Sequence, residues 1–277
     1  LAEALQSEIA AALQVRQWPL LNPTMDDAIN GPAVVPEVEP CGVPTPPEDA
    51  ECTWGSETAP VRAVLVGDEL ALNYAGPLRE LALNSNGRFQ LHVEAMPGCP
   101  FADDLIFNDD QAIMDACAGR RQRTVDYIAA KQPTVVFVAH SYGRKFRPAL
   151  PEMTPADWTA ALRRMVDKTG PHKVVLLAPP PIGYDLRECY GKPSSVPSDC
   201  TNGVSARWNR LAYAEQKLAA DAKWAWIDSR PWFCSGRYCP AFVGTTPTRH
   251  DEEQMTPAYG SKISPVIAEA LHEAGIL

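Results

Sequence analysis

The chain has 277 residues, a net charge of −9 and no run of apolar residues long enough to span a membrane. The acidic balance excludes the basic surface that nucleic-acid binding requires, and it argues against simple adhesion to anionic lipid. The length suits one large α/β domain, or one domain with an appendage. Because the sequence opens at Leu1 without a Met or a signal peptide, we expect a mature form or a part of a longer protein.

The first 59 residues differ in character from the rest. Leu1–Gln14 has apolar residues at helical spacing, which predicts a helix that packs on the body or links to a preceding segment. Gln17–Ala59 is rich in Pro and lacks periodicity, as is typical of an irregular segment. We therefore divide the chain into an N-terminal extension, residues 1–59, that wraps over an α/β domain, residues 60–277.

Strands and helices alternate from Val61 to the C-terminus. Runs of apolar residues predict five buried strands: Val61–Val66, Phe89–Ala95, Pro133–His140, Lys173–Ala178 and Trp224–Asp228. Helical spacing follows in the segment that begins at Leu70 and in Asp109–Ala130, Thr154–Lys168, Val204–Ala220 and Pro257–Gly275. This alternation predicts a flavodoxin-like three-layer α/β sandwich with a central five-stranded parallel sheet and right-handed crossovers.

Eight cysteines give the clearest indication of the compartment. They form four couples that are local in the sequence: Cys41/Cys52, Cys99/Cys117, Cys189/Cys200 and Cys234/Cys239. An even number of cysteines in local couples predicts four disulfides and therefore an oxidising, extracytoplasmic location. A zinc site is the competing interpretation, but the Cys-x2-Cys spacing common in structural zinc sites is absent. Eight cysteines allow many connectivities, so the pairing is a prediction.

Polar side chains follow several predicted strands at their carboxyl ends, where ligands bind in parallel sheets. The turn Gly67-Asp68-Glu69 ends the first strand, Gly98 follows the second, and His140-Ser141 follows the third. The loop Arg249–Thr256 precedes the last helix, and the long loop Pro179–Cys200 follows the fourth strand. We expect these segments to border one site, although Glu69 would also favour the helix dipole by its charge alone.

The order of these blocks resembles the SGNH (GDSL-like) hydrolase family. More closely, it resembles the C-terminal extracytoplasmic SGNH domain of bacterial membrane O-acyltransferases that modify cell-surface glycans. The resemblance covers Val61 to the end and depends on VLVGDE, MPGCP, VVFVAHS, WFCSGRYCPAFVG and RHDEEQMTPAYGSKISP. The last two segments are the most specific, because a Gly-Asp turn alone is a weak signal.

The resemblance implies a nucleophilic Ser directly after Gly-Asp, and a catalytic His three residues after an Asp. In this sequence Glu69 stands at the nucleophile position and Gln254 at the His position, while Asp251 is kept. The implied oxyanion and substrate-binding residues lie in the second and third blocks: Gly98, His140 and Ser141.

We therefore interpret the chain as an extracytoplasmic SGNH-like domain, periplasmic or at the cell surface, of a membrane acyltransferase. By resemblance, that protein O-acylates cell-envelope glycans or glycolipids. Loss of the alcohol and the imidazole removes Ser/His catalysis, so the expected role is binding or presenting the acceptor. The implied partners are the glycan or glycolipid and the membrane portion of the same protein, reached through a preceding segment absent from this chain. We expect no cofactor, no metal and no nucleic acid.

Two alternatives stay open. In the first, Ser141 and either His140 or His250 form a rearranged nucleophile and base, and the domain is an active ester hydrolase or O-acetyltransferase. In the second, a carboxylate-rich site binds a metal or a cationic ligand, and its residues are Glu69, Asp251, Glu253 and His140.

Overall fold

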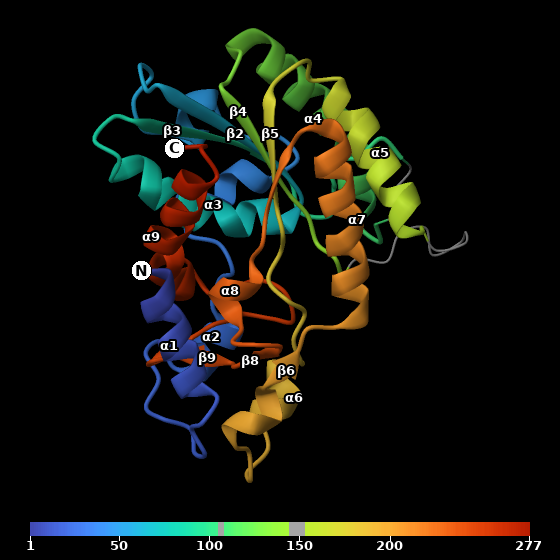
Figure 1. Cartoon of the computed structure of the whole chain (residues 1–277). Helices are drawn as coiled ribbons and strands as arrows, with labels where there is room; N and C mark the ends of the chain where they lie inside the picture. The colour runs from blue at the N-terminus through green and yellow to red at the C-terminus, as the bar shows by residue number, and fades with distance from the viewer. Residues whose placement is uncertain (105–107, 144–152) are drawn as a thin grey trace.

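The computed structural model describes residues 1–104, 108–143 and 153–277 (Figure 1). Its centre is a six-stranded sheet with the strand order β1-β3-β2-β4-β5-β7. The parallel strands are β2 (Val61–Gly67), β3 (Phe89–Ala95), β4 (Val135–Ala139), β5 (Lys173–Leu177) and β7 (Ala225–Ile227). They match the five predicted strands, and their order is that of flavodoxin-like folds. The predicted fold class is thus confirmed.

The sheet is buried on both faces because helices cover each of them (Figure 1). On one face, α3 (Glu69–Leu83) and α9 (Pro257–Glu273) pack against inward side chains that include Ala63, Leu65, Phe137 and Val175. On the other face lie α4 (Gln111–Lys131), α5 (Pro155–Asp167) and α7 (Ala206–Ala222), packed against Val64, Val66, Val136 and Val138. The alternation of side chains along each strand therefore builds two separate apolar cores.

Side-chain caps explain where the helices begin. A polar side chain accepts a backbone N–H in the first turn of each helix that covers the sheet: Asp68, Asp110, Thr154, Ser205 and Thr256. Such caps satisfy N–H groups that have no partner within the helix. The predicted helices therefore agree with the observed ones to within two residues.

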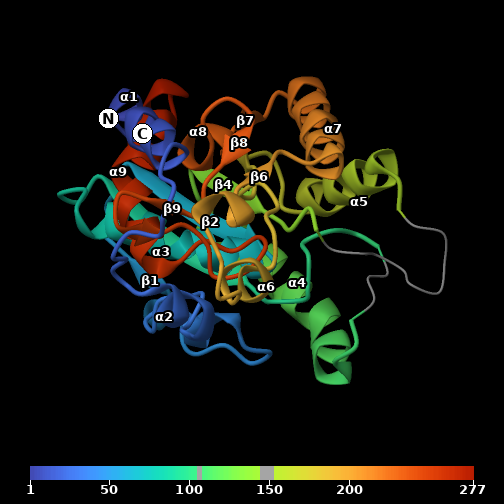
Figure 2. The ribbon, with the colours of Figure 1, turned by 90° about the horizontal axis from the view of Figure 1, so that it is seen from below.

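Shorter elements connect these layers at the lower end of the molecule in Figure 1. The short helices are α2 (Met25–Asn30), α6 (Leu186–Tyr190) and α8 (Arg230–Phe233), with a 3-10 turn at Pro197–Cys200. Two further 3-10 turns, Glu39–Gly42 and Asp49–Cys52, contact β3 instead. The short strands form two antiparallel pairs: β6 (Asn202–Gly203) with β8 (Tyr238–Cys239), and β9 (Phe242–Val243) with β10 (Thr246–Pro247). Figure 2 views the molecule from this end, toward which the carboxyl ends of the parallel strands point.

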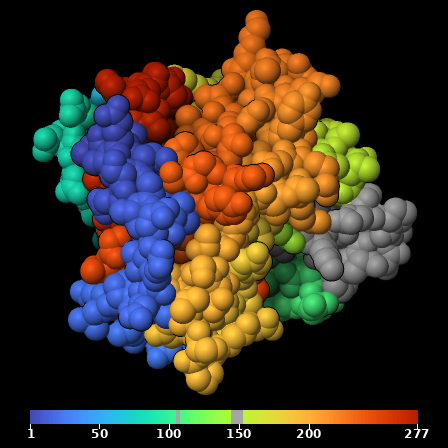
Figure 3. All heavy atoms as spheres, turned by 60° about the horizontal axis from the view of Figure 1, so that its bottom comes forward, coloured from blue at the N-terminus to red at the C-terminus, as the bar shows by residue number. Residues whose placement is uncertain are grey.

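The N-terminal extension is joined to the α/β core at several places. Helix α1 (Ala2–Ala12) contributes Leu5 and Ile9 to the core beneath α9 and contacts α8 and β9. Strand β1 (Thr53–Trp54) pairs antiparallel with β3 at the edge of the sheet, a strand that the sequence analysis missed because two residues show no alternation. In Figure 3 the extension, in blue, lies on the surface beside the C-terminal segments. The boundary at residue 59 remains a prediction.

All four predicted disulfides are present, as Cys41–Cys52, Cys99–Cys117, Cys189–Cys200 and Cys234–Cys239, and no cysteine is free. Four disulfides are typical of proteins that fold in an oxidising compartment, which places this domain outside the cytoplasm. Among the described residues, no helix combines the length and the apolar character needed to cross a bilayer.

Candidate functional site

The turn after β2 fixes the site because its backbone packs closely against β4. Gly67 has a φ of 144°, and a Cβ at this position would lie 1.9 Å from the carbonyl oxygen of Ala139. Asp68, which is fully buried, accepts from the backbone N–H of Leu70 and, at 3.1 and 3.2 Å, from that of Ser141. Asp68 therefore starts α3 and also joins it to the loop after β4.

Glu69, at the position to which the resemblance assigns the nucleophile, is half-buried and accepts a hydrogen bond from the backbone of the segment after β3. Its Oε2 accepts from the backbone N–H of Gly98 at 3.1 Å. Gly98 has a φ of 76°, and a Cβ there would lie 2.2 Å from Nδ2 of Asn108, so the position requires Gly. The resemblance assigns this N–H to an oxyanion, and here it faces a carboxylate of the protein itself.

His140 is buried and has its Nε2 bonded to the backbone. The N–H of Phe101 donates to Nε2 at 2.8 Å, so this nitrogen carries the lone pair and Nδ1 the proton of a neutral ring. The indole of Trp158 meets the imidazole edge-on, with ring centroids 4.9 Å apart. His140 is therefore held by the chain that follows β3 and by α5.

The hydroxyl of Ser141 has a carboxylate as its partner in the described structure. Ser141 is 4% exposed and donates from Oγ to Oε2 of Glu253. The other candidate base, His250, makes a hydrogen bond between Nδ1 and the carbonyl of Ala28 in the extension, at 2.8 Å. Among the described contacts the hydroxyl of Ser141 is thus paired with Glu253, while its pairing with an imidazole stays a prediction.

Glu253 connects the C-terminal loop to the loop after β4. Its Oε1 accepts from the backbone N–H groups of Tyr142, at 2.7 Å, and Gly143, at 2.8 Å, while Oε2 accepts from Ser141. Burial raises the pKa of Glu253 to about 7, although the hydrogen bonds from Ser141 and Gly143 oppose the rise. Sequence reasoning placed this residue in a carboxylate cluster and missed its role as an acceptor for three donors.

Asp251 and Gln254 belong to the same turn, whose backbone Asp251 stabilises. Oδ1 of Asp251 accepts from the backbone N–H groups of Glu253, at 2.9 Å, and Gln254, at 2.6 Å. The backbone carbonyl of Gln254 in turn accepts from the backbone N–H of His250 at 2.8 Å. In the related hydrolases an Asp at this position orients an imidazole, but here it orders the loop that carries Glu253.

The side-chain positions do not support the alternative of a carboxylate-rich metal site, and the alternative of a cationic ligand stays a prediction. Among the described residues, the ligand atoms of Glu69, Asp251, Glu253 and His140 do not form a group close enough to share an ion, whereas Asp49, His92 and Glu94 do. That second group lies along β3, where Thr53 bonds Nδ1 of His92 at 2.7 Å and Glu94 bonds Nε2 at 2.9 Å.

Two guanidinium groups already neutralise this second group. Arg120 lies 3.2 Å from Glu94, and Arg123 lies 3.2 Å from Glu94 and 2.7 Å from Asp49. Burial alone would raise the pKa of Glu94, but the hydrogen bond from His92 and the charges of His92, Arg120 and Arg123 lower it. The group is an ion-pair network that stabilises β3 against α4, and its cations disfavour a metal.

A further buried carboxylate lies beneath the site and was not anticipated. Glu215 of α7 accepts from the hydroxyl of Tyr142 and, at 3.0 Å, from Nε1 of Trp158. Burial raises its pKa to about 7, against these two hydrogen bonds. The signal available in the sequence was its helical spacing with the apolar residues Leu211 and Ala219, which places a Glu on the buried face of α7.

Comparison with solved structures finds several proteins of related fold, among them these three. The periplasmic domain of a lipopolysaccharide acetyltransferase from Salmonella ser. Paratyphi A has a TM-score of 0.59 and 15% identity, over 75% of this chain and 83% of that one. An aryl esterase from M. smegmatis has a TM-score of 0.51 and 16% identity, over 77% and 99%. The carbohydrate acetylesterase Est24 from Sinorhizobium meliloti has a TM-score of 0.51 and 13% identity, over 77% and 99%.

At these identities the three likenesses show a common fold. The comparison with curated proteins gives no match. A family model described as an SGNH domain fused to AT3 domains matches residues 40–268, which include the whole sheet, the residues of the site and the end of the extension. The chain belongs to this family of SGNH domains that are fused to AT3 acyltransferase domains.

Proposed function

We propose that this domain binds or presents the acceptor during O-acylation of a cell-envelope glycan or glycolipid, without Ser/His ester chemistry of its own. The acyl chemistry would belong to the membrane acyltransferase portion, to which a preceding segment would tether the domain. The single observation that carries the proposal is the hydrogen bond from the Gly98 N–H to the carboxylate of Glu69.

The physical reason is the sign of the charge at this position. In acyl transfer, preorganised donors stabilise negative charge that develops on the carbonyl oxygen. Here the carboxylate of Glu69 accepts from one such donor and places negative charge beside the region where the oxyanion would form. Removal of the Ser or the His of a triad costs on the order of a millionfold in kcat, and the resemblance assigns those two positions to Glu69 and Gln254.

The glycan partner is supported by the chemistry named for two proteins of the same fold. One is a lipopolysaccharide acetyltransferase domain and the other a carbohydrate acetylesterase. Both act on acylated carbohydrates according to their descriptions, and the family joins such domains to acyltransferases. A carbohydrate acceptor is therefore the partner class that best fits a domain of this type.

The test is hydrolysis of p-nitrophenyl acetate at neutral pH. The unaltered chain is expected to match the buffer rate, whereas Glu69→Ser combined with Gln254→His should exceed it, because the pair restores an alcohol and an imidazole beside Asp251. The matched control is Glu188→Ser, which introduces a hydroxyl at an exposed position of α6. Hydrolysis by the unaltered chain that Ser141→Ala abolishes would overturn the proposal.

A second candidate function is ester hydrolysis or O-acetyl transfer with Ser141 as nucleophile and Glu253 as base. The hydrogen bond between them and the raised pKa of Glu253 favour it. Two observations place it second: Ser141 is almost fully buried, and Glu253 itself accepts from the N–H groups of Tyr142 and Gly143. Glu253→Gln should abolish any such activity, while activity that survives in this variant excludes Glu253 as the base.

A further inference from the structure

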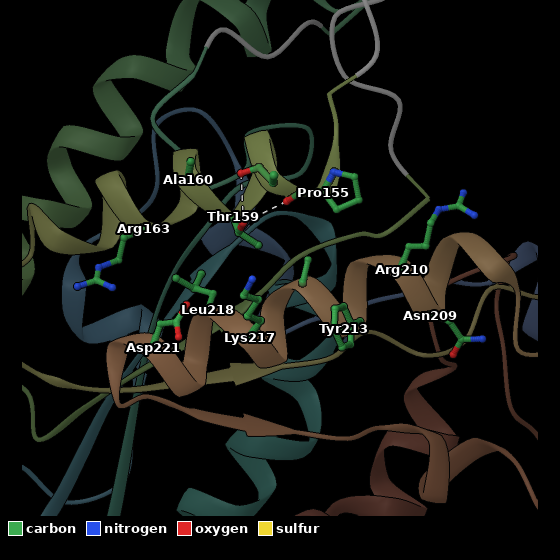
Figure 4. A pocket seen from close by; sticks show the side chains of 12 residues that line it. Pro155, Thr159, Ala160, Arg163, Asn209, Arg210, Tyr213, Lys217, Leu218 and Asp221 are labelled. Carbon is green, nitrogen blue, oxygen red and sulfur yellow. Dashed lines mark hydrogen bonds between the residues drawn. The ribbon is translucent and has the colours of Figure 1, made fainter.

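A groove lies between the outer surfaces of α5 and α7 (Figure 4). These two helices cover the face of the sheet opposite to α3 and α9 (Figure 1). Its volume is about 710 Å³, which lies in the range typical of ligand sites. Lys217 and Leu218 point from α7 toward α5 in Figure 4. The side chains that matter for its chemistry are Arg163, Arg210, Tyr213, Lys217 and Asp221.

The groove is locally basic although the whole chain carries a charge of −9. Three cations and one carboxylate line it. Arg163 is engaged, because it pairs with Asp167 at 2.9 Å and lies over the ring of Trp224. Arg210 and Lys217 are exposed and make no salt bridge with any residue that the structure describes, so their charges are available to an anionic ligand.

Tyr213 lies between these two cations on the same face of α7. Seven residues separate Arg210 from Lys217, which is two helical turns or roughly 10 Å along the axis. Tyr213 stands between them and is 71% exposed, so its ring is open to a ligand. An exposed ring between two cations offers an apolar face for a sugar ring and charges for its acidic groups.

We propose that the α5–α7 groove binds an anionic glycan segment, in which sugar rings stack on Tyr213 and carboxylate or phosphate groups pair with Arg210 and Lys217. This inference rests on the proposed function, because it names the chemical class of the acceptor that the domain presents. Charge complementarity selects an acidic glycan over a neutral one. An anionic membrane surface would lie against a much larger part of the protein than this groove. The net charge of −9 on the whole chain therefore disfavours binding to such a surface.

The groove is coupled to the candidate site by the buried network beneath it. Trp158 of α5 and Glu215 of α7 share a hydrogen bond, and Glu215 also binds the hydroxyl of Tyr142 in the site loop. Trp158 contacts His140 on its other side. Both walls of the groove are thereby held in a defined position relative to the loop after β4. A glycan bound in the groove would therefore also have a defined position relative to that loop.

Isothermal titration calorimetry with tetragalacturonate as the anionic probe and maltotetraose as the neutral one tests the inference. Tetragalacturonate should bind at least tenfold more tightly than maltotetraose, and its affinity should fall at high salt because exposed charges are screened. Arg210→Glu combined with Lys217→Glu should weaken it by at least tenfold. Tyr213→Ala should weaken it about threefold to tenfold, and Tyr213→Phe should retain it because the ring is kept.

The matched control is Lys192→Glu combined with Arg237→Glu, two charge reversals at exposed positions outside the groove, which should bind like the unaltered chain. Equal affinity for the two oligosaccharides, no binding of tetragalacturonate, or unchanged binding after the groove reversals would overturn the inference. A third arm measures binding to phosphatidylglycerol vesicles. If the chain binds the vesicles but not tetragalacturonate, and the groove reversals abolish the vesicle binding, the groove faces a membrane and the inference is overturned. Ester hydrolysis by the unaltered chain would refute the proposed function alone, because the titration measures the groove independently.

Discussion

Replacement of Glu215 by Gln is expected to change how the stability of the domain depends on pH. Burial raises the pKa of this carboxyl from 4.5 to about 7. The folded state therefore keeps the proton over a range in which the unfolded chain has lost it. At about 1.4 kcal/mol per pKa unit, the folded state loses on the order of 3 kcal/mol relative to the unfolded state as the pH rises from 4.5 to about 7.

The sign follows from proton binding. Below pH 4.5 both states are protonated and the group has no effect on the pH dependence. Between pH 4.5 and about 7 the folded state binds more protons than the unfolded state, so unfolding becomes easier as the pH rises, and above this window the effect is constant. Gln resembles the protonated acid and cannot lose a proton. The free energy of unfolding of Glu215→Gln should therefore rise by about 3 kcal/mol relative to that of the unaltered chain as the pH increases across that window.

Urea denaturation followed by tryptophan fluorescence at several pH values from 4.5 to 8, with the disulfides oxidised, measures this difference. The readout is the change with pH rather than the offset, because Gln can also alter the hydrogen bonds to Tyr142 and Trp158 by a constant amount. Glu188→Gln, at an exposed position of α6, controls for the loss of one carboxylate. A difference between Glu215→Gln and the unaltered chain that stays constant across these pH values refutes the reasoning.

Three further substitutions test the turns and cross-links that support the site. Gly67→Ala should destabilise the domain by at least about 2 kcal/mol in thermal denaturation, because its Cβ would meet the backbone of β4, whereas Gly119→Ala in α4, where nothing lies within 4 Å, should be neutral or stabilising. Asp68→Ala should cost about 1–3 kcal/mol in urea denaturation, since two buried N–H groups lose their acceptor. Cys99→Ser with Cys117→Ser should cost about 3 kcal/mol in the same assay, because the disulfide no longer restricts the unfolded chain between two residues 18 positions apart.

The sequence predicted the sheet well because its information is local. Strands β2, β4 and β5 are apolar along nearly their whole length, since both faces are covered, whereas β3 also carries Gln90, His92 and Glu94. The long helices that cover the sheet have a polar cap directly before them. The disulfides were predictable for a related reason, because the partners lie 5 to 18 residues apart. Strand β1 was missed because its pairing with β3 depends on tertiary contacts rather than on its own two residues.

The site was predictable in place but not in its partnerships. The blocks around Glu69 and Gly98 do meet, because both follow adjacent parallel strands. The contact between Ser141 and Glu253 joins residues separated by 112 positions, and nothing in the local sequence distinguishes Glu253 from its acidic neighbours. Glu215 was missed for the opposite reason, because it lies in the middle of a helix that is distant from every motif and reaches the site only through Tyr142 and Trp158.

The carboxylates at the carboxyl edge of the sheet explain why a nucleophile alone would not restore an efficient hydrolase. Asp68, Glu69 and Glu253 each accept from at least one backbone N–H, and these donors come from the first turn of α3 and from the loops after β3 and β4. Glu69→Ser with Gln254→His releases the donor on Gly98, but Glu253 still accepts from Tyr142 and Gly143. The double variant should therefore hydrolyse ester slowly. Its introduced hydroxyl should nevertheless be labelled by a fluorophosphonate, because labelling needs one nucleophilic attack and no complete catalytic cycle. Labelling that is no faster than in Glu188→Ser would mean that the environment of Glu69, and not only its side chain, has lost the geometry for acyl transfer.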